Sequence, residues 1–324
     1  MPVIVTSEEI HPFLPSLGSG VAIERERAAH QDIRPLEIVI LNLMADKMAT
    51  ERQLALWLGN TTLQVHVTFA ATDSYVRAVQ AGRESKNTSA DHIRKFYSAW
   101  SDIKHQKFDG LIVTGVNALH PRVSDEPIWG EVQEILKWSE TNIFSSLFLC
   151  WGAQAAMKYF HNIENIKGEK KIFGLFDHII ISDKTGLLFG FPDCFPVPVS
   201  RWKNPDEAAI KACAALEVVA ASAESGSNIM AEPSPFDKTQ FYPKRVYVLN
   251  HPEYETDTLQ REYARDSTRF PDTPLPRHYF PDNDCGRAPV NSWRHTAYLY
   301  TNWIKAIYEA TPYNLADIPK PFSP

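Results

Sequence analysis

A single cysteine stands where an apolar run meets a stretch of small, helix-forming residues. The segment 147–154 reads LFLCWGAQ, which predicts a strand that runs through a sharp turn at Cys150 into a helix. A thiol at such a turn lies beside the free N–H groups of a helix N-terminus, which favour the thiolate and therefore a nucleophile. The competing interpretation is a structural cysteine, because free cysteines often act as small core residues.

A histidine and a glutamate follow a second predicted strand. The run RVYVLN at 245–250 leads directly into His251, Pro252 and Glu253. Residues two apart in an extended segment face the same way, so Glu253 can lie beside His251. A nucleophilic thiol needs a base, and the base needs a third group that fixes its tautomer. Because ligands bind at the carboxyl ends of strands in open α/β sheets, these residues predict a Cys–His–Glu catalytic site.

The elements that must position these residues alternate between strands and helices from residue 35 onward. This order predicts an α/β fold with a doubly wound, mostly parallel sheet flanked by helices and carrying peripheral additions. The predicted strands are 37–43, 63–69, 108–115, 143–149, 172–181, 216–221, 229–231 and 245–250. The predicted helices are 48–58, 88–100, 126–139, 152–160, 255–266 and 292–310, and the proline-rich segments 189–198 and 270–289 are predicted loops.

The domain organisation follows from the same pattern. We expect an N-terminal arm at 1–34, a single α/β domain at 35–315 and a C-terminal tail at 316–324. Length alone allows either one large domain or two average ones, and no flexible linker divides the chain.

The composition narrows the function classes. The 324 residues include 33 Lys plus Arg and 39 Asp plus Glu, so the formal net charge is -6 and no broad basic surface for nucleic acid or an anionic membrane is expected. Four cysteines without a CxxC pair predict neither a disulfide scaffold nor a zinc site, and no metal is expected. The N-terminus lacks the order of a signal peptide, and the most apolar stretch, 143–160, is interrupted by polar residues. We therefore expect a cytoplasmic protein with reduced thiols.

Several longer motifs resemble those of the homoserine O-acyltransferases of methionine biosynthesis, a family with the class I glutamine amidotransferase fold. The resemblance runs from about residue 29 to 315. The matching stretches are HQDIRPL at 30–36, ILNLM at 40–44, ESKNT at 84–88, DGLIVTG at 109–115, CWGAQAA at 150–156, HPEY at 251–254 and TPY at 311–313.

The resemblance implies a role for particular residues. Cys150 matches the nucleophile that takes the acyl group from acyl-CoA as a thioester, His251 the base and Glu253 its orienting carboxylate. It also implies ping-pong kinetics, acyl-CoA as a co-substrate with no bound cofactor, and a possible homodimer. Further positions match an oxyanion site (Lys47 and the N–H of Trp151) and an amino-acid site (Lys171, Ser200 and Arg265, with Arg201 and Gln53 as weaker candidates).

Departures from the family pattern bear on the substrates. Asp46 replaces a lysine, Val199 a histidine and Asn250 a glycine, and 75–82 is an insertion. The position that separates succinyl from acetyl users matches Leu119, whose bulk is expected to narrow the acyl pocket and favour acetyl-CoA.

Several functions remain open from the sequence. Homoserine is the expected acceptor, and L-serine or a related hydroxy amino acid is the alternative. A Cys-dependent, glutaminase-like hydrolase and a non-catalytic binding protein are the other classes. The amino-acid-site matches argue against the hydrolase, and the retained Cys150, His251 and Glu253 argue against the non-catalytic protein.

Overall fold

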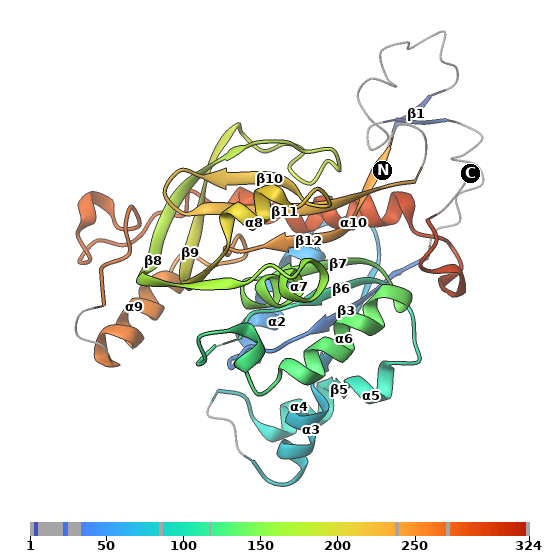
Figure 1. The fold of residues 1–324 in the computed structure, drawn as a ribbon, viewed down its shortest axis with the longest axis horizontal. Helices are drawn as coiled ribbons and strands as arrows, with labels where there is room; N and C mark the ends of the chain where they lie inside the picture. The colour runs from blue at the N-terminus through green and yellow to red at the C-terminus, as the bar shows by residue number, and fades with distance from the viewer. Residues whose placement is uncertain are drawn as a thin grey trace.

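The computed structural model describes residues 3–5, 22–24, 34–83, 87–116, 118–236, 240–269 and 273–321. Ten strands form one sheet in the order β5-β4-β3-β6-β7-β12-β11-β10-β8-β9 (Figure 1). The first six in this order pair in parallel: β5 (Tyr97–Ala99), β4 (Val65–Ala71), β3 (Leu36–Leu41), β6 (Phe108–Val113), β7 (Ile143–Leu149) and β12 (Phe241–Val248). The other four pair antiparallel: β11 (Gly226–Pro235), β10 (Glu217–Ser222), β8 (Asn165–Ile180) and β9 (Cys194–Pro205).

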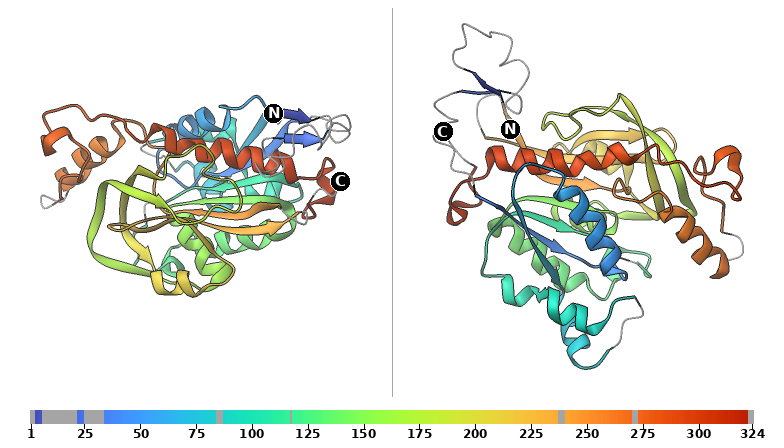
Figure 2. Two further views of the ribbon diagram at one scale, coloured as in Figure 1. Left: turned by 90° about the horizontal axis from the view of Figure 1, so that it is seen from above. Right: turned by 180° about the vertical axis from the view of Figure 1, so that it is seen from behind.

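Helices cover both faces of this sheet (Figure 2). Helices α2 (Lys47–Leu58) and α10 (Tyr298–Ala310) lie on one face, and α6 (Trp129–Asn142), α7 (Trp151–His161) and α8 (Glu207–Ala212) lie on the other. The alternation along β3 shows why: Ile38 and Ile40 pack with the α2 and α10 side, whereas Val39 and Leu41 pack with the opposite core. The predicted doubly wound, mostly parallel α/β fold is confirmed.

The predicted helix 88–100 is wrong in its second half. The chain forms α4 (Ala90–Phe96), then the short strand β5, and then α5 (Trp100–Ile103). Tyr97 leaves the helix because its backbone is extended and pairs with Phe69 of β4. Apolar spacing fits both conformations here, and pairing with the sheet decides between them. Ser89 caps α4, since its hydroxyl accepts the N–H of His92 at 3.2 Å.

The predicted loop 189–198 is also wrong from Cys194 onward, where the chain enters β9. Pro196 and Pro198 are tolerated in this strand because β9 is the edge of the sheet and pairs only with β8. Proline lacks the N–H that a second neighbouring strand would require.

Two further helices lie at the carboxyl-end side of the sheet. The segment around the expected insertion forms α3 (Asp73–Gln80), and α9 (Thr258–Arg269) follows the His-Pro-Glu motif. Short 3-10 turns complete the fold: η2 (Val123–Asp125), η3 (Pro281–Asn283), η4 (Arg294–Ala297) and η5 (Leu315–Asp317). None of the helices in the described ranges is long and apolar enough to cross a bilayer.

Both ends of the chain extend beyond the sheet. In the predicted N-terminal arm, β1 (Val3–Val5) and β2 (Ala22–Glu24) pair in parallel with each other, and most of 1–34 lies outside the described residues. At the other end, Ile318 is buried, and the Lys107 ammonium donates to the carbonyls of Ala316 and Ile318 at 2.9 and 2.6 Å. Packing on the sheet domain therefore continues past the predicted boundary at 315.

Candidate active site

Cys150 occupies a sharp turn between β7 and α7. Its φ of 50° and ψ of -111° form a backbone conformation that residues other than glycine rarely adopt. The Cys150 N–H donates to the carbonyl of Val248 at 2.7 Å, which fixes the turn to the neighbouring strand β12. The half-buried thiol faces Gly115, where a Cβ atom would lie only 3.7 Å from the Cys150 Sγ. The strand-to-helix presentation predicted for Cys150 is thus present.

Gly152 allows α7 to approach the end of β6. A Cβ atom at this position would lie 2.7 Å from the carbonyl oxygen of Val113 and 2.9 Å from that of Thr114. Both are backbone atoms, so relief of the clash would require a shift of the helix that carries Cys150 at its N-terminus.

We expect Gly152→Ala to lower the free energy of unfolding by about 1–3 kcal/mol, the usual cost of overpacking. Gly130→Ala is a matched control, because Gly130 is also the second residue of a helix, also follows a tryptophan, and has no atom within 4 Å of its Cβ position. Urea titration should show a loss for Gly152→Ala and a gain of up to about 1 kcal/mol for Gly130→Ala. Equal changes would show that the close approach of α7 is unimportant.

His251 and Glu253 form a buried relay beside this cysteine. The His251 Nδ1 lies 2.8 Å from the Glu253 Oε1, and the Tyr300 hydroxyl donates to the Glu253 Oε2 at 3.0 Å. The Cys150 side chain lies near enough to the imidazole for its charge to raise the pKa of His251. The Tyr254 ring stacks on the imidazole with centroids 4.2 Å apart. The structure therefore brings together the three residues predicted for catalysis.

The surroundings of His251 favour its protonated form. Burial alone lowers the pKa of His251, but the negative charges of Glu253 and Cys150 together raise it well above its ordinary value. A protonated imidazole can give its proton to a leaving group, and in its neutral form it can remove one. The arrangement can therefore activate Cys150 and hold a proton ready for a leaving group.

The predicted amino-acid site converges on two carboxylates of α9. Ser200 donates to the Glu262 Oε2 at 2.5 Å. The Lys171 ammonium lies 2.9 Å from the Asp266 Oδ2 and 3.8 Å from the Glu262 Oε2, and Arg265 donates to the Asp266 Oδ1 at 2.7 Å. Lys171 is on β8 and Ser200 on β9, so these strands and α9 enclose one cluster of both charge signs.

Tyr254 joins this cluster to the catalytic relay. Its hydroxyl donates to the Glu262 Oε1 at 2.7 Å while its ring stacks on His251. An amino acid held by the charged cluster would thus lie close to the proposed base, with the Tyr254 ring between the cluster and His251.

Arg201 follows Ser200 in β9 and lies near Cys150. It is almost fully buried and donates to the side chain of Asn250, to the carbonyl of Ser225 and, at 2.6 Å, to the Asn204 side chain. Burial lowers the pKa of Arg201 to about 10, an effect opposed by the negative charges of Cys150 and Glu207. Its described hydrogen bonds go to neutral groups, and its role as a weaker candidate for the amino-acid site stays a prediction.

Asn250 accounts for one departure from the family pattern. Its side-chain amide is completely buried and donates to the His178 Nε2 at 3.0 Å while its oxygen accepts from Arg201. His178 can accept because its Nδ1 donates to the carbonyl of Phe176 at 2.8 Å, and burial lowers the pKa of His178 to about 4. A neutral histidine thus orients the amide that holds Arg201.

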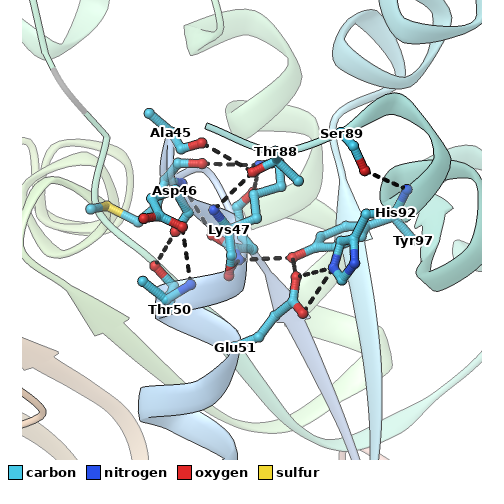
Figure 3. A network of polar contacts seen from close by, with 12 residues as sticks. Ala45, Asp46, Lys47, Thr50, Glu51, Thr88, Ser89, His92 and Tyr97 are labelled. Carbon is cyan, nitrogen blue, oxygen red and sulfur yellow. Dashed lines mark hydrogen bonds and ion pairs between the residues drawn. The ribbon is translucent and has the colours of Figure 1, made fainter. Parts of the chain in front are cut away.

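Lys47 begins α2 and lies in a dense polar network (Figure 3). Its ammonium donates to the carbonyls of Asn42 and Met44 at 2.5 and 3.2 Å and lies 4.5 Å from the centroid of the Tyr75 ring. Burial lowers the pKa of Lys47 to about 8, against the opposing charge of Glu51. An ammonium has three N–H donors, so one remains for a reacting oxygen.

The rest of this network anchors α2 (Figure 3). Asp46, which replaces a lysine of the family pattern, caps the helix by accepting the N–H of Ala49 at 3.1 Å. Glu51 accepts from the Tyr97 hydroxyl at 2.5 Å and lies 3.0 Å from the His92 Nε2. The acid at position 46 therefore has a structural role at the helix N-terminus.

Two other predicted residues do not join the site. Leu119 is 86% exposed, because the loop after β6 turns its side chain toward solvent. In the described part of the chain no contact places Leu119 in a pocket, so its effect on the acyl group stays a prediction. Gln53 is buried on α2, and none of the described contacts connects it with the Lys171 cluster.

Sequence reasoning missed three residues of the site: Tyr254, Glu262 and Tyr300. Tyr254 directly follows the His-Pro-Glu motif, which offered a signal for it, whereas Glu262 lies on α9, which begins only at Thr258, so no helical spacing connects the two. Tyr300 comes from α10, 47 residues after Glu253, and no local pattern indicates its contact.

The chain is similar to known proteins over most of its length. The family model described as homoserine O-succinyltransferase matches residues 12–313. Similar proteins include homoserine O-acetyltransferases from Novosphingobium aromaticivorans (41% identical, covering 92% of this chain and 93% of that protein), Clostridium botulinum (40%, 91% and 92%) and Bacillus subtilis (39%, 90% and 92%).

Solved structures with the same fold are more distant in sequence. A protein from Thermoplasma acidophilum described as part of a GMP synthase matches with a TM-score of 0.50 and 14% identity, covering 85% of this chain and 96% of that chain. A glutamine amidotransferase from Thermotoga maritima has a TM-score of 0.49 and 12% identity, covering 85% and 97%. The glutamine amidotransferase-like fold expected from the sequence is confirmed.

Proposed function

Because the chain belongs to the homoserine O-succinyltransferase family, we propose that it transfers an acetyl group from acetyl-CoA to the hydroxyl of L-homoserine through a thioester on Cys150. The observation that carries the proposal is the buried His251–Glu253 pair, which lies beside Cys150 at the N-terminus of α7. The choice of acetyl and of homoserine is supported by the names of relatives at about 40% identity.

The first half of the proposed reaction forms the acyl-enzyme. The Cys150 thiolate attacks the carbonyl carbon of acetyl-CoA, and the new C–S bond gives a tetrahedral oxyanion. The N–H of Trp151, at the first position of α7, is a free helix donor for that oxygen. When the bond to the CoA sulfur breaks, the CoA thiolate takes the proton that His251 holds.

The second half transfers the acetyl group to the acceptor. Neutral His251 removes the proton from the acceptor hydroxyl, and the oxygen attacks the Cys150 thioester. The C–S bond to Cys150 then breaks, and the enzyme recovers its thiolate and imidazolium. Glu253 orients the imidazole in both halves because the Nδ1 proton remains directed at the carboxylate.

The Lys171 cluster fits a zwitterionic acceptor. Lys171 and Arg265 provide cations for an α-carboxylate, and Glu262 provides a carboxylate for an α-ammonium group. In an acidic protein, such local cations are needed to hold an anionic group. Tyr254 contacts both Glu262 of this cluster and His251. An acceptor held by the cluster would therefore lie close to the base, with its side-chain hydroxyl directed toward it.

Lys47 is proposed as the second donor to the oxyanion, which requires the ammonium form. We expect kcat/KM for acetyl-CoA to fall as the pH rises through about 8, because Lys47 is charged below its pKa and neutral above it. Lys47→Arg should move this alkaline limb to higher pH, since a guanidinium keeps its charge.

The exposed Lys95→Arg on α4 is the control for the same change of side chain and should leave the pH profile unchanged. An alkaline limb that stays in place in Lys47→Arg would assign it to another group and remove the support for Lys47 as an oxyanion donor.

Intact-protein and peptide mass spectrometry after mixing with acetyl-CoA tests the thioester directly. We expect one acetyl adduct on Cys150, absent from Cys194, Cys213 and Cys285, and its loss on addition of L-homoserine. Failure to trap any adduct under acid quench, in enzyme that turns over, would contradict the two-step mechanism.

Initial rates distinguish homoserine from serine as the acceptor and acetyl-CoA from succinyl-CoA as the donor. Values of kcat/KM for L-homoserine and L-serine, each with acetyl-CoA and succinyl-CoA, should be highest for homoserine with acetyl-CoA. A higher value for L-serine would assign the enzyme to serine O-acetylation. Glutamine hydrolysis with negligible rates for all four pairs would favour the glutaminase-like reaction.

A further inference from the structure

A cavity of about 650 Å³ opens at the carboxyl ends of β3, β4 and β6. This volume lies within the range of small-molecule sites, and the position is where open α/β sheets bind ligands. Its wall is mixed: apolar side chains make up the larger part, and the charged residues are the basic Lys47 and Arg83 and the acidic Glu131. The lining residues used below are Met44, Lys47, Tyr75, Val79, Arg83 and Val116.

The cavity borders the nucleophile. Met44 and Val116 line it, and both lie beside Gly115: Val116 is the next residue, and a Cβ atom on Gly115 would lie 3.6 Å from the Met44 Sδ and 3.3 Å from the Cys150 Cβ. When an acyl group is bound to Cys150 through its carbonyl carbon, the rest of the acyl chain therefore lies next to this cavity.

Helix α3 forms the wall opposite α2. The Tyr75 ring faces the Lys47 ammonium at 4.5 Å, and Val79 is buried against Ile93 and Tyr97. Helix α3 is also fixed to its surroundings at its start, where Glu131 accepts the N–H of Ser74 at 3.1 Å. Tyr75 is thus a rigidly mounted wall residue, carried by the segment that the sequence marks as an insertion.

We propose that the acyl group of the donor extends from Cys150 into this cavity and that Tyr75 limits the length of the acyl chain that fits. The ligand class is a straight-chain acyl thioester, bound with its carbonyl at Cys150 and its chain along the apolar wall. This inference rests on the proposed acyl transfer and assigns donor selectivity to α3, because the exposed Leu119 lies outside the cavity lining.

Donor selectivity of Tyr75 variants tests the proposal. The measured quantity is the ratio of kcat/KM for butyryl-CoA to that for acetyl-CoA. Tyr75→Ala should raise this ratio about tenfold or more, because each methylene that gains space is worth about 10-fold or more in a hydrophobic pocket. Tyr75→Trp should lower it, and Arg77→Ala, on the same helix but outside the lining, should leave it unchanged.

The donor ratios of the Tyr75 variants, compared with that of a Leu119 variant, decide whether the proposal holds. Folded Tyr75 variants that all keep the wild-type ratio, or a Leu119→Ala variant that alone changes it, would overturn the proposal. The KM for the acceptor should stay constant in Tyr75→Ala, since the Lys171 cluster lies on other elements.

Binding without turnover separates this inference from the proposed function. Non-hydrolysable thioether analogues of acetyl-CoA and butyryl-CoA can be titrated calorimetrically into wild-type and Tyr75→Ala protein. Selectivity that depends on Tyr75 in a protein without turnover would keep the cavity assignment and reject acyl transfer. Binding of both analogues that ignores Tyr75, or no binding at all, would reject the cavity assignment.

Discussion

Replacement of Cys150 by alanine is expected to lower kcat/KM for acetyl transfer by about 10⁴-fold or more, because the thioester can no longer form. The loss should be accompanied by the disappearance of the acetyl adduct. Acetyl-CoA binding should persist, since Met44 and Val116 still line the neighbouring cavity. Steady-state rates, intact-protein mass spectrometry and calorimetric titration of the thioether analogue measure the three effects separately.

Cys213→Ala is the matched control for this variant. The Cys213 Sγ lies 3.6 Å from the His161 Nδ1, so it is also a half-buried thiol beside an imidazole. His161 ends α7, the helix that Cys150 begins, which puts the second thiol at the far end of the same helix. Loss of activity in Cys213→Ala, or substantial turnover in Cys150→Ala, would contradict the assignment of the nucleophile.

The second large effect concerns the carboxylate that orients the base. We expect Glu253→Gln to lower kcat/KM by about 10³- to 10⁴-fold without disrupting the fold. Glu253 accepts from His251 on one oxygen and from Tyr300 on the other, whereas an amide can accept only on its single oxygen. The loss of the negative charge also removes a cause of the raised pKa of His251. Slower alkylation of Cys150 by iodoacetamide at neutral pH should reveal the smaller thiolate fraction.

Glu232 is a control for this variant, because it contacts a histidine and a tyrosine as Glu253 does but lies outside the proposed site. Its Oε1 lies 2.8 Å from the His161 Nε2 and accepts from the Tyr247 hydroxyl at 2.5 Å, as Glu253 does from its own histidine and tyrosine. Glu232→Gln should cost stability, because Arg245 pairs with that carboxylate, yet keep the activity of the folded fraction. Comparable losses of activity per folded molecule in both variants would show that a buried carboxylate as such, rather than the Cys150 relay, explains the effect.

The sequence predicts the central elements of the fold because their patterns leave little choice. Strand β7 is buried throughout and is predicted at its observed bounds, and β6 and α2 are shifted by two residues or fewer. The errors occur where a short segment fits two conformations. Tyr97 becomes part of an edge strand, and the prolines of β9 are accommodated because that strand has one neighbour. Helix α3 is predicted only as an insertion, although Tyr75, Val76 and Val79 have helical spacing.

The residues of the site also fall into those that the sequence predicts and those that it does not. Cys150, His251 and Glu253 follow from the rule that parallel strands deliver side chains to one edge of the sheet. Tyr300 and Glu262 come from other elements, and their contacts depend on how α10 and α9 pack, which no local spacing reveals. Leu119 is a different case: its role is predicted from resemblance alone, and the loop after β6 turns its side chain outward.

The pairing of β7 with β12 has a consequence for how such an enzyme can diversify. These strands are parallel neighbours, with Leu149 opposite Val248, so Cys150 and the His251 segment are spaced by the hydrogen-bond ladder itself. The surrounding walls come from separately attached pieces such as α3 and α9. Insertions and replacements in those pieces can therefore alter which molecules enter while the distance between thiol and imidazole is inherited unchanged. The sheet thus fixes the positions of the reacting groups, whereas changes in the attached helices can change the substrate specificity.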